Sequence, residues 1–242
     1  MGSIHRQRRA IIKKGMLLPF GLQAFNLAAF PLNSGRNLAE FVTRDPNAPL
    51  ESLGFGSCNR QTADQSFWNN IVSFNPDLWV WLGDNIYGDN LDPVERQKEY
   101  ERVLTAPGYE DLRARSEVIG VWDDHDFGYD NAGSKFKGKK ESQQVFLDFM
   151  GVPIDSVRRL QEGIYTQKVY GPPGRQVSIF CLDARYFRDR PGADASMLGA
   201  KQWQWLESQV EKCESELIII ASSILFLSSG YCAQVSKRPN PE

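Results

Sequence analysis

The amino-acid sequence predicts a mixed α/β domain. Short apolar segments typical of strands alternate along the chain with longer segments whose apolar residues recur at helical spacing. One apolar segment, residues 78–82, is uninterrupted, as expected of a strand covered on both faces. The length of 242 residues suits one domain with a short appendage, and 41% apolar and 24% charged residues are typical of a soluble globular protein.

Each element of the first half follows from a local pattern. Phe67, Ile71 and Phe74 lie at helical spacing, Pro76 ends that helix, and Gly83 ends the strand after it. The predicted elements are a strand at 53–56, a helix at 65–74, a strand at 78–82, helices at 94–104 and 109–115, and a strand at 118–122.

The second half continues the alternation. We expect a helix at 139–150, strands at 164–170 and 176–182 joined by a Pro-Pro-Gly turn, a helix at 198–213 and a strand at 217–221. The helix at 198–213 has the clearest periodicity, with Trp203, Leu206, Val210 and Cys213 on one face. The all-apolar strand at 217–221 is expected to be buried.

Charge is unevenly distributed. The net charge is −2, but residues 1–39 contain six Lys and Arg and no acid. Five of these basic residues precede an apolar stretch at 15–32, which is the layout of an export signal, and Arg8-Arg9 resembles a twin-arginine motif. We expect residues 1–40 to be a leader for export or organelle targeting that contacts a membrane surface or translocation machinery through residues 1–32. An amphipathic helix or an unstructured leader is the alternative, and residues 41–52 form a linker.

The sequence contains no motif for several common classes of function. The four cysteines are widely spaced without a CxxC pair, which argues against a zinc ribbon or a disulfide scaffold. No G-x-S-x-G, P-loop or G-x-G-x-x-G motif occurs. The net charge gives no general case for a nucleic-acid-binding module. A binding module built on Trp and Tyr residues has only the aromatic content in its favour.

Three predicted strands are followed by polar residues that can bind a metal ion. These are residues 57–59 (SCN), 83–89 (GDNIYGD) and 123–126 (DDHD). In open α/β sheets such strand ends meet in one crevice. The crowded aspartates would repel one another without a cation, and a thiolate at Cys58 or a nearby phenolate would favour iron or zinc. His125 would then donate a proton or bind phosphate.

Each of these residues also has a structural interpretation. Cys58 alone is most often a buried small side chain, and Asp84 could cap a helix. Tyr87 and Tyr100 could be core or surface aromatics. The run Asp-Asp-His-Asp at 123–126 is the most specific of the signals, because four such groups rarely pack together for stability.

Taken together, these motifs resemble the alkaline phosphatase D (PhoD-like) family of the calcineurin-like metallophosphoesterase superfamily. The resemblance extends over roughly residues 52–223 and rests on these segments: 55–59 (FGSCN), 76–78 (PDL), 82–89 (LGDNIYGD), 122–128 (WDDHDFG), 130–133 (DNAG), 181–186 (CLDARY), 198–199 (LG) and 202–206 (QWQWL). It implies a β-sandwich core flanked by helices in αββα layers. It also implies hydrolysis of a phosphoester substrate, monoester or diester, by attack of a metal-bound hydroxide.

The resemblance assigns roles to particular residues. Cys58 corresponds to a thiolate ligand, Asp84 to a bridging carboxylate, Asp124 to a further ligand with Asp123 beside it, and His125 to the catalytic histidine. The family also has a tyrosinate ligand, for which Tyr100 is the best match by position and Tyr87 the second. Asn85 and Asp183 are weaker candidates. The implied cofactors are two or more metal ions, iron or calcium, with zinc or manganese as further candidates.

One departure from the family concerns its carboxyl end. The family carries further metal-binding histidines there, whereas residues 224–242 contain none. We therefore expect a partial domain at 53–223, incomplete at its C-terminal end, followed by a divergent tail at 224–242. The alternative function is accordingly a non-catalytic, truncated product with an incomplete metal site.

Overall fold

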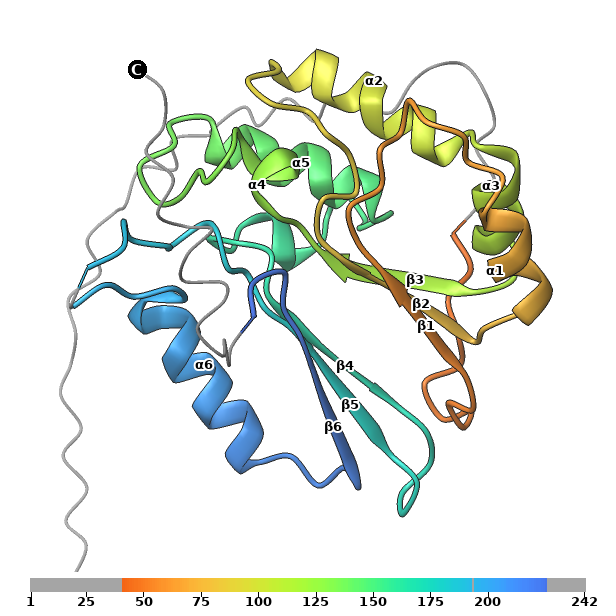
Figure 1. The fold of residues 1–242 in the computed structure, drawn as a ribbon. Helices are drawn as coiled ribbons and strands as arrows, with labels where there is room; N and C mark the ends of the chain where they lie inside the picture. Colours follow the sequence, from red (N-terminus) through yellow and green to blue (C-terminus); the bar gives the residue numbers. More distant parts are fainter. Residues whose placement is uncertain (1–40, 193, 226–242) are drawn as a thin grey trace, which may run out of the picture.

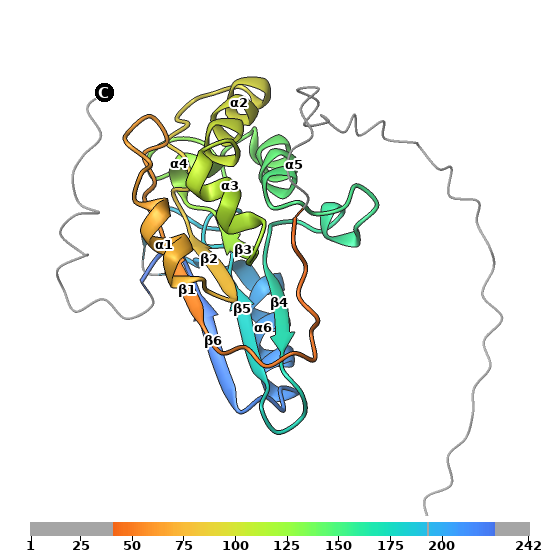
Figure 2. The same cartoon turned by 90° about the vertical axis from the view of Figure 1, so that its right-hand side faces the viewer.

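The computed structural model describes residues 41–192 and 194–225. Two three-stranded sheets lie side by side, with helices on their outer sides (Figure 1). Helices α1, α2, α3 and α5 lie against the first sheet, on the side away from the second sheet. Helix α6 lies against the second sheet, on the side away from the first (Figures 1 and 2). One hydrophobic core joins the two sheets, since Val80 and Val118 belong to the same cluster as Ile179 and Cys181. This arrangement is the layered α/β sandwich expected from the sequence.

The first sheet is entirely parallel. It consists of β1 (Leu53–Gly56), β2 (Leu78–Leu82) and β3 (Glu117–Val121), in that spatial order. Leu53 pairs with Leu78, and Leu78 pairs with Glu117, so the strands begin at one edge and end at the other. The carboxyl ends of all three strands are therefore neighbours.

Helices cover the outer face of this sheet. They are α1 (Trp68–Phe74), α2 (Pro93–Leu104), α3 (Pro107–Arg113) and α5 (Lys139–Phe149). The one-turn α4 (Asp124–Phe127) instead follows the carboxyl end of β3. Aromatic side chains fill the space beneath the four covering helices. Trp68 lies 5.3 Å from Trp79 and 5.4 Å from Trp81 between ring centroids, and the Trp81 Nε1 donates to the Tyr109 hydroxyl at 2.9 Å. Large buried aromatic rings of this kind contribute much of a core's stability.

The second sheet is mixed. Its strands are β4 (Thr166–Tyr170), β5 (Val177–Cys181) and β6 (Leu217–Ala221), preceded by the short 3₁₀ helix η1 (Val157–Arg159). β4 and β5 pair antiparallel. β5 and β6 pair parallel, and the chain between these two strands contains α6 (Gly199–Glu211). A small cluster made by Phe180, Leu182, Leu198 and Leu206 holds α6 against this sheet.

Of two sequence predictions in this sheet, one holds only in part and one is wrong. α6 buries Leu206 of the predicted apolar face together with the polar Gln202, whereas Trp203 and Val210 of that face are 39% and 38% exposed. Gln202 is buried because its side-chain amide forms hydrogen bonds with both the N–H and the carbonyl of Asp183, each at 2.8 Å. The prediction of a buried strand at 217–221 is wrong. Leu217 and Ile220 are 51% and 50% exposed, since β6 is an edge strand among the described residues.

Other differences are small. Most element bounds lie within three residues of the predicted ones, and neither α4 nor η1 was expected. Within residues 41–192 and 194–225, no helix is long and apolar enough to cross a membrane. The expectation of a targeting leader at residues 1–40 falls outside the described residues.

Candidate metal centre

The carboxyl ends of the three parallel strands bring together three predicted ligands, Cys58, Asp84 and Asp124, and the predicted catalytic residue His125. Potential ligand atoms of Asp84, Asp124 and His125 all lie within 4.8 Å of one another. Cys58 joins them from the end of β1, with its Sγ 3.7 Å from Asp84 Oδ2. Residues separated by up to 67 positions in the sequence thus meet at one edge of the sheet.

The backbone at this edge is held in unusual conformations. Cys58 and Asp84 have φ angles of 59° and 50°, which non-glycine residues rarely adopt. Two backbone hydrogen bonds fix them, from Cys58 N to Gly83 O at 3.1 Å and from Asn59 N to Asp84 O at 2.8 Å. Such conformations persist where the surroundings impose them, and they are common at functional sites.

Asp84 is the central carboxylate of the cluster. Burial raises its pKa to about 6, and the charges of Asp123 and Asp124 act in the same direction. Its buried Oδ1 has no hydrogen-bond partner among the described residues. A buried carboxylate oxygen without a partner is unfavourable, and a cation at this point would satisfy it. Carboxylates, a thiol and an imidazole form a donor set that fits a Lewis-acidic metal ion.

Arg185 organises the two neighbouring aspartates. Its Nε donates to Asp123 Oδ1, and its Nη2 lies 3.5 Å from Asp124 Oδ1. Asp123 also accepts a bond of 2.9 Å from the hydroxyl of Ser223. Asp123 is therefore turned towards Arg185 and Ser223, beside the cluster. Sequence reasoning assigned no role to Arg185, although the segment 181–186 that contains it was among the family motifs.

His125 is oriented by Asp89. The His125 Nδ1 lies 2.8 and 2.9 Å from the two carboxylate oxygens of Asp89, which leaves Nε2 available to a ligand. Burial lowers the pKa of His125, but the hydrogen bond to Asp89 and the charges of Asp84, Asp89 and Asp124 outweigh it and raise the pKa above its ordinary value. Asp89 belongs to the motif at 83–89, but nothing in the sequence indicates its contact with His125.

The two candidate tyrosines lie in different places. Tyr87 is half-buried beside Cys58, and burial, followed by the charges of Cys58 and Asp84, raises its pKa. Its ring lies 4.5 Å from that of His125. Tyr100 is fully buried on α2, and its hydroxyl donates to Asp126 Oδ1 at 3.0 Å. Tyr87 is thus in the cluster, whereas the Tyr100 hydroxyl points to a carboxylate behind it.

Asp126 ties the loops of the site together. Its carboxylate accepts hydrogen bonds from the backbone N–H groups of Asn85 at 3.1 Å and Asp123 at 2.9 Å, in addition to Tyr100. It is completely buried, and burial raises its pKa to about 7. Asp126 therefore fixes the position of the loop after β2 relative to α4, a role that only the fold reveals.

The weaker candidates from the sequence have structural contacts. Asn85 is buried, and its Nδ2 donates to Val121 O at 3.1 Å. Asp183 is buried at the end of β5, where its carboxylate accepts from Trp122 Nε1 at 2.9 Å and from the Tyr186 N–H at 2.8 Å. Neither belongs to the group of ligand atoms around Asp84.

A cavity of about 300 Å³ opens beside the cluster. Cys58, Arg60, Phe67 and Trp79 are among the residues that line it. Arg60 also lies over the Tyr87 ring, 5.4 Å from its centroid. The candidate metal centre thus has an adjoining space with an aromatic wall and a cationic group.

Comparisons with known proteins identify the family and a similar fold. Residues 53–239 match the family model described as PhoD-like phosphatase. Among solved structures, the chain is similar to one of PhoD, with 19% identity and a TM-score of 0.59. The likeness covers 78% of this chain and 44% of that one, and at this identity it is evidence for the fold alone. Comparison with curated proteins gave no match.

Proposed function

The chain belongs to the PhoD-like phosphatase family, and we propose that it hydrolyses phosphate mono- or diesters with metal ions bound at Cys58, Asp84 and Asp124. The observation that carries this proposal is the convergence of the three strand ends. It places two carboxylates and an imidazole within 4.8 Å of one another, with a thiol beside them. A buried, unpaired oxygen of Asp84 faces no other protein donor among the described residues.

The residues divide into those that hold metal and those that act on the substrate. Asp84 would bridge ions, Cys58 and Asp124 would each bind one, and Tyr87 would supply a phenolate. Bound iron, calcium, zinc or manganese would supply Lewis-acid activation of a phosphate oxygen and of the attacking water. Arg185 contacts both Asp123 and Asp124, and its positive charge reduces the repulsion between the two carboxylates.

His125 would serve the leaving group. Asp89 holds the imidazole by Nδ1 and favours its protonated form. Nε2 can then donate a hydrogen bond to a phosphate oxygen or transfer a proton to the departing alkoxide. The cavity beside Cys58, with Arg60 and Phe67, would accept the remainder of the ester.

A second candidate function is binding of metal or phosphate without turnover. It is favoured by the ligand set, because His125 and His5 are the only histidines in the sequence and the described cluster contains only one imidazole. The chain also spans 44% of the length of the PhoD structure it matches. On this hypothesis the chain binds metal at the same residues but leaves a phosphoester intact.

A hydrolysis assay tests the proposal. The purified full chain would be assayed with p-nitrophenyl phosphate and with bis-p-nitrophenyl phosphate, before chelation, after chelation and after each metal is returned. We expect turnover that disappears with the chelator, returns with a metal, and falls by about 100-fold or more in His125→Asn. Metal uptake without turnover would favour the second candidate, and turnover unaffected by chelation would contradict both.

A further inference from the structure

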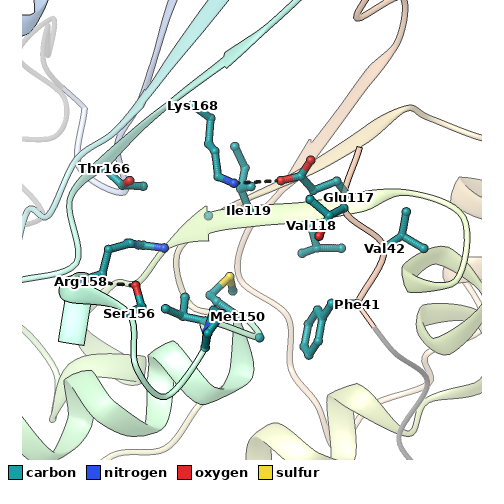
Figure 3. A pocket seen from close by; sticks show the side chains of 15 residues that line it. Phe41, Val42, Glu117, Val118, Ile119, Met150, Ser156, Arg158, Thr166 and Lys168 are labelled. Atoms are coloured by element: carbon teal, nitrogen blue, oxygen red, sulfur yellow. Dashed lines mark hydrogen bonds and ion pairs between the residues drawn. The ribbon is translucent and has the colours of Figure 1, made fainter. Parts of the chain in front are cut away.

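A second cavity lies away from the metal centre, between β3 and β4 (Figure 3). Each of these strands is at the edge of its own sheet. The cavity has a volume of about 360 Å³, which is in the range of small-molecule sites. It runs beside β3 from Glu117 to Gly120, and none of the four clustered residues of the metal centre lines it.

Much of the cavity wall is apolar. Phe41 and Met150 form one side, and Val118 and Ile119 of β3 form another (Figure 3). Val118 and Ile119 are each 7% exposed, and Met150 is 9% exposed. A hydrocarbon or aryl group placed here would be removed from water, which is favourable in proportion to the apolar area it buries.

Three charged side chains line the same space, and two of them neutralise each other. Lys168 Nζ lies 3.2 Å from Glu117 Oε1, and the Glu117 side chain is 8% exposed. Glu117 Oε2 also accepts the backbone N–H of Arg44 at 3.2 Å. Neither charge of this pair is therefore free for a ligand.

Arg158 is the third charged group, and among the described residues it has no acidic partner. Its Nη2 donates to the carbonyl of Ile164 at 3.0 Å, while its buried Nε has no hydrogen-bond partner among the described residues. No carboxylate forms an ion pair with it within residues 41–192 and 194–225. Burial lowers its pKa, but an arginine retains its charge at neutral pH. The cavity therefore carries one net positive charge beside an apolar wall.

We propose that this cavity binds a small monoanionic carboxylate, with its carboxylate on Arg158 and its apolar body against Ile119 and Met150. A guanidinium presents parallel N–H donors that match the two oxygens of a carboxylate. A dianion fits less well, because the cavity has one uncompensated charge and Glu117 would repel the second. The proposed ligand is thus chemically distinct from a phosphoester substrate of the metal centre.

The test compares two ligands of equal chain length, octanoate and octan-1-ol, by titration calorimetry on the full chain. A chelator is present so that no metal ion can hold the carboxylate. We expect saturable binding of octanoate with one site per chain, about tenfold tighter than octan-1-ol or more. Arg158→Gln should remove this preference. Arg175→Gln is the matched control, since it removes an exposed arginine outside the cavity and should leave the preference intact.

Two results would overturn the proposal. One is equal affinity of the unmodified chain for octanoate and octan-1-ol. The other is an Arg158→Gln variant that binds octanoate as tightly as the unmodified chain. If Arg158→Gln does not fold, as judged by circular dichroism, the comparison of the two ligands on the unmodified chain decides the question without it.

Discussion

Cys58 and Asp84 occupy left-handed backbone conformations at the ends of adjacent strands, and their side chains meet there. Gly83 makes this approach possible. A Cβ at Gly83, whose φ is +99°, would lie 2.7 Å from Asp123 Cβ and 2.8 Å from Ser223 Cβ. The chain therefore accepts local strain and close backbone contact at the point where the candidate ligands converge.

Cysteine alkylation tests the place of Cys58 in the centre. Cys58 is exposed, whereas Cys181 is buried and burial raises its pKa to about 12. Iodoacetamide should therefore modify Cys58 readily and Cys181 hardly at all, because the thiolate is the reactive form. Added metal should slow the modification of Cys58 several-fold, as measured by peptide mass spectrometry. Modification of Cys58 at the same rate with and without metal would argue against thiolate ligation.

The two tyrosines make a second pair of variants. Tyr87→Phe should weaken metal binding by about tenfold, because the hydroxyl beside Cys58 is lost. Tyr100→Phe removes the bond to Asp126 but retains the ring, which stacks on Phe149 at 4.4 Å. It should lower the free energy of unfolding by about 1 kcal/mol and change metal affinity less. If Tyr100→Phe were the variant with the greater loss of metal affinity, the assignment would be reversed.

At the scale of elements, hydrophobic patterns predicted most of the fold. An uninterrupted apolar run located β2, and helical spacing located α1 and α6. The polar residues that follow β1, β2 and β3 could also be predicted to lie together, because the carboxyl ends of neighbouring parallel strands meet. Periodicity could not show which side of α6 is buried, since a polar residue, Gln202, bonds the backbone of Asp183 inside the protein.

Contacts between segments far apart in the chain could not be predicted from the sequence either. Arg185 lies 62 residues from Asp123, and Asp89 lies 36 residues from His125, so no local spacing indicates either pair. The residue types expected at the candidate metal centre could be predicted from strand ends. The Arg185 contact, however, depends on how the two sheets pack, and the Asp89 contact depends on the path of the loop after β2.

A pair of variants in α6 tests the corrected face of that helix. Gln202→Ala leaves the buried N–H and carbonyl of Asp183 without their side-chain partners, and it should lower the free energy of unfolding by about 1–3 kcal/mol. Val210→Ala lies on the face predicted from the sequence, which is partly exposed, and should have a much smaller effect. Denaturant unfolding would measure both, and a larger loss for Val210→Ala would contradict the observed orientation.

At the scale of the whole molecule, the described residues expose apolar side chains on two edge strands. Phe55 of β1 is 64% exposed, and Leu217 and Ile220 of β6 are 51% and 50% exposed. Unpaired edges with apolar side chains favour association with another chain. The described residues therefore combine a well-packed aromatic core with two edge strands, β1 and β6, at which another chain could add a strand.

This feature predicts self-association that rises with concentration. Ile220→Lys should reduce it, because a lysine on an edge strand opposes pairing. Val94→Lys is the control, since Val94 is also apolar and 47% exposed but lies on α2. Sedimentation velocity over a range of concentrations would compare the three proteins. A monomer at every concentration, or an equal effect of both lysines, would show that β6 does not mediate association.

Calorimetric metal titration tests whether the three strand ends form a metal centre with Asp84 at its middle. The full chain, Asp84→Asn and Asp130→Asn would be titrated with the same ion; Asp130 is an exposed residue of the loop after α4. Because loss of a supporting contact alone reduces metal affinity by roughly 10–100-fold, loss of the Asp84 carboxylate should reduce it by more. We expect this large loss for Asp84→Asn and an affinity for Asp130→Asn close to that of the unmodified chain. Equal affinities for the two variants would contradict this expectation.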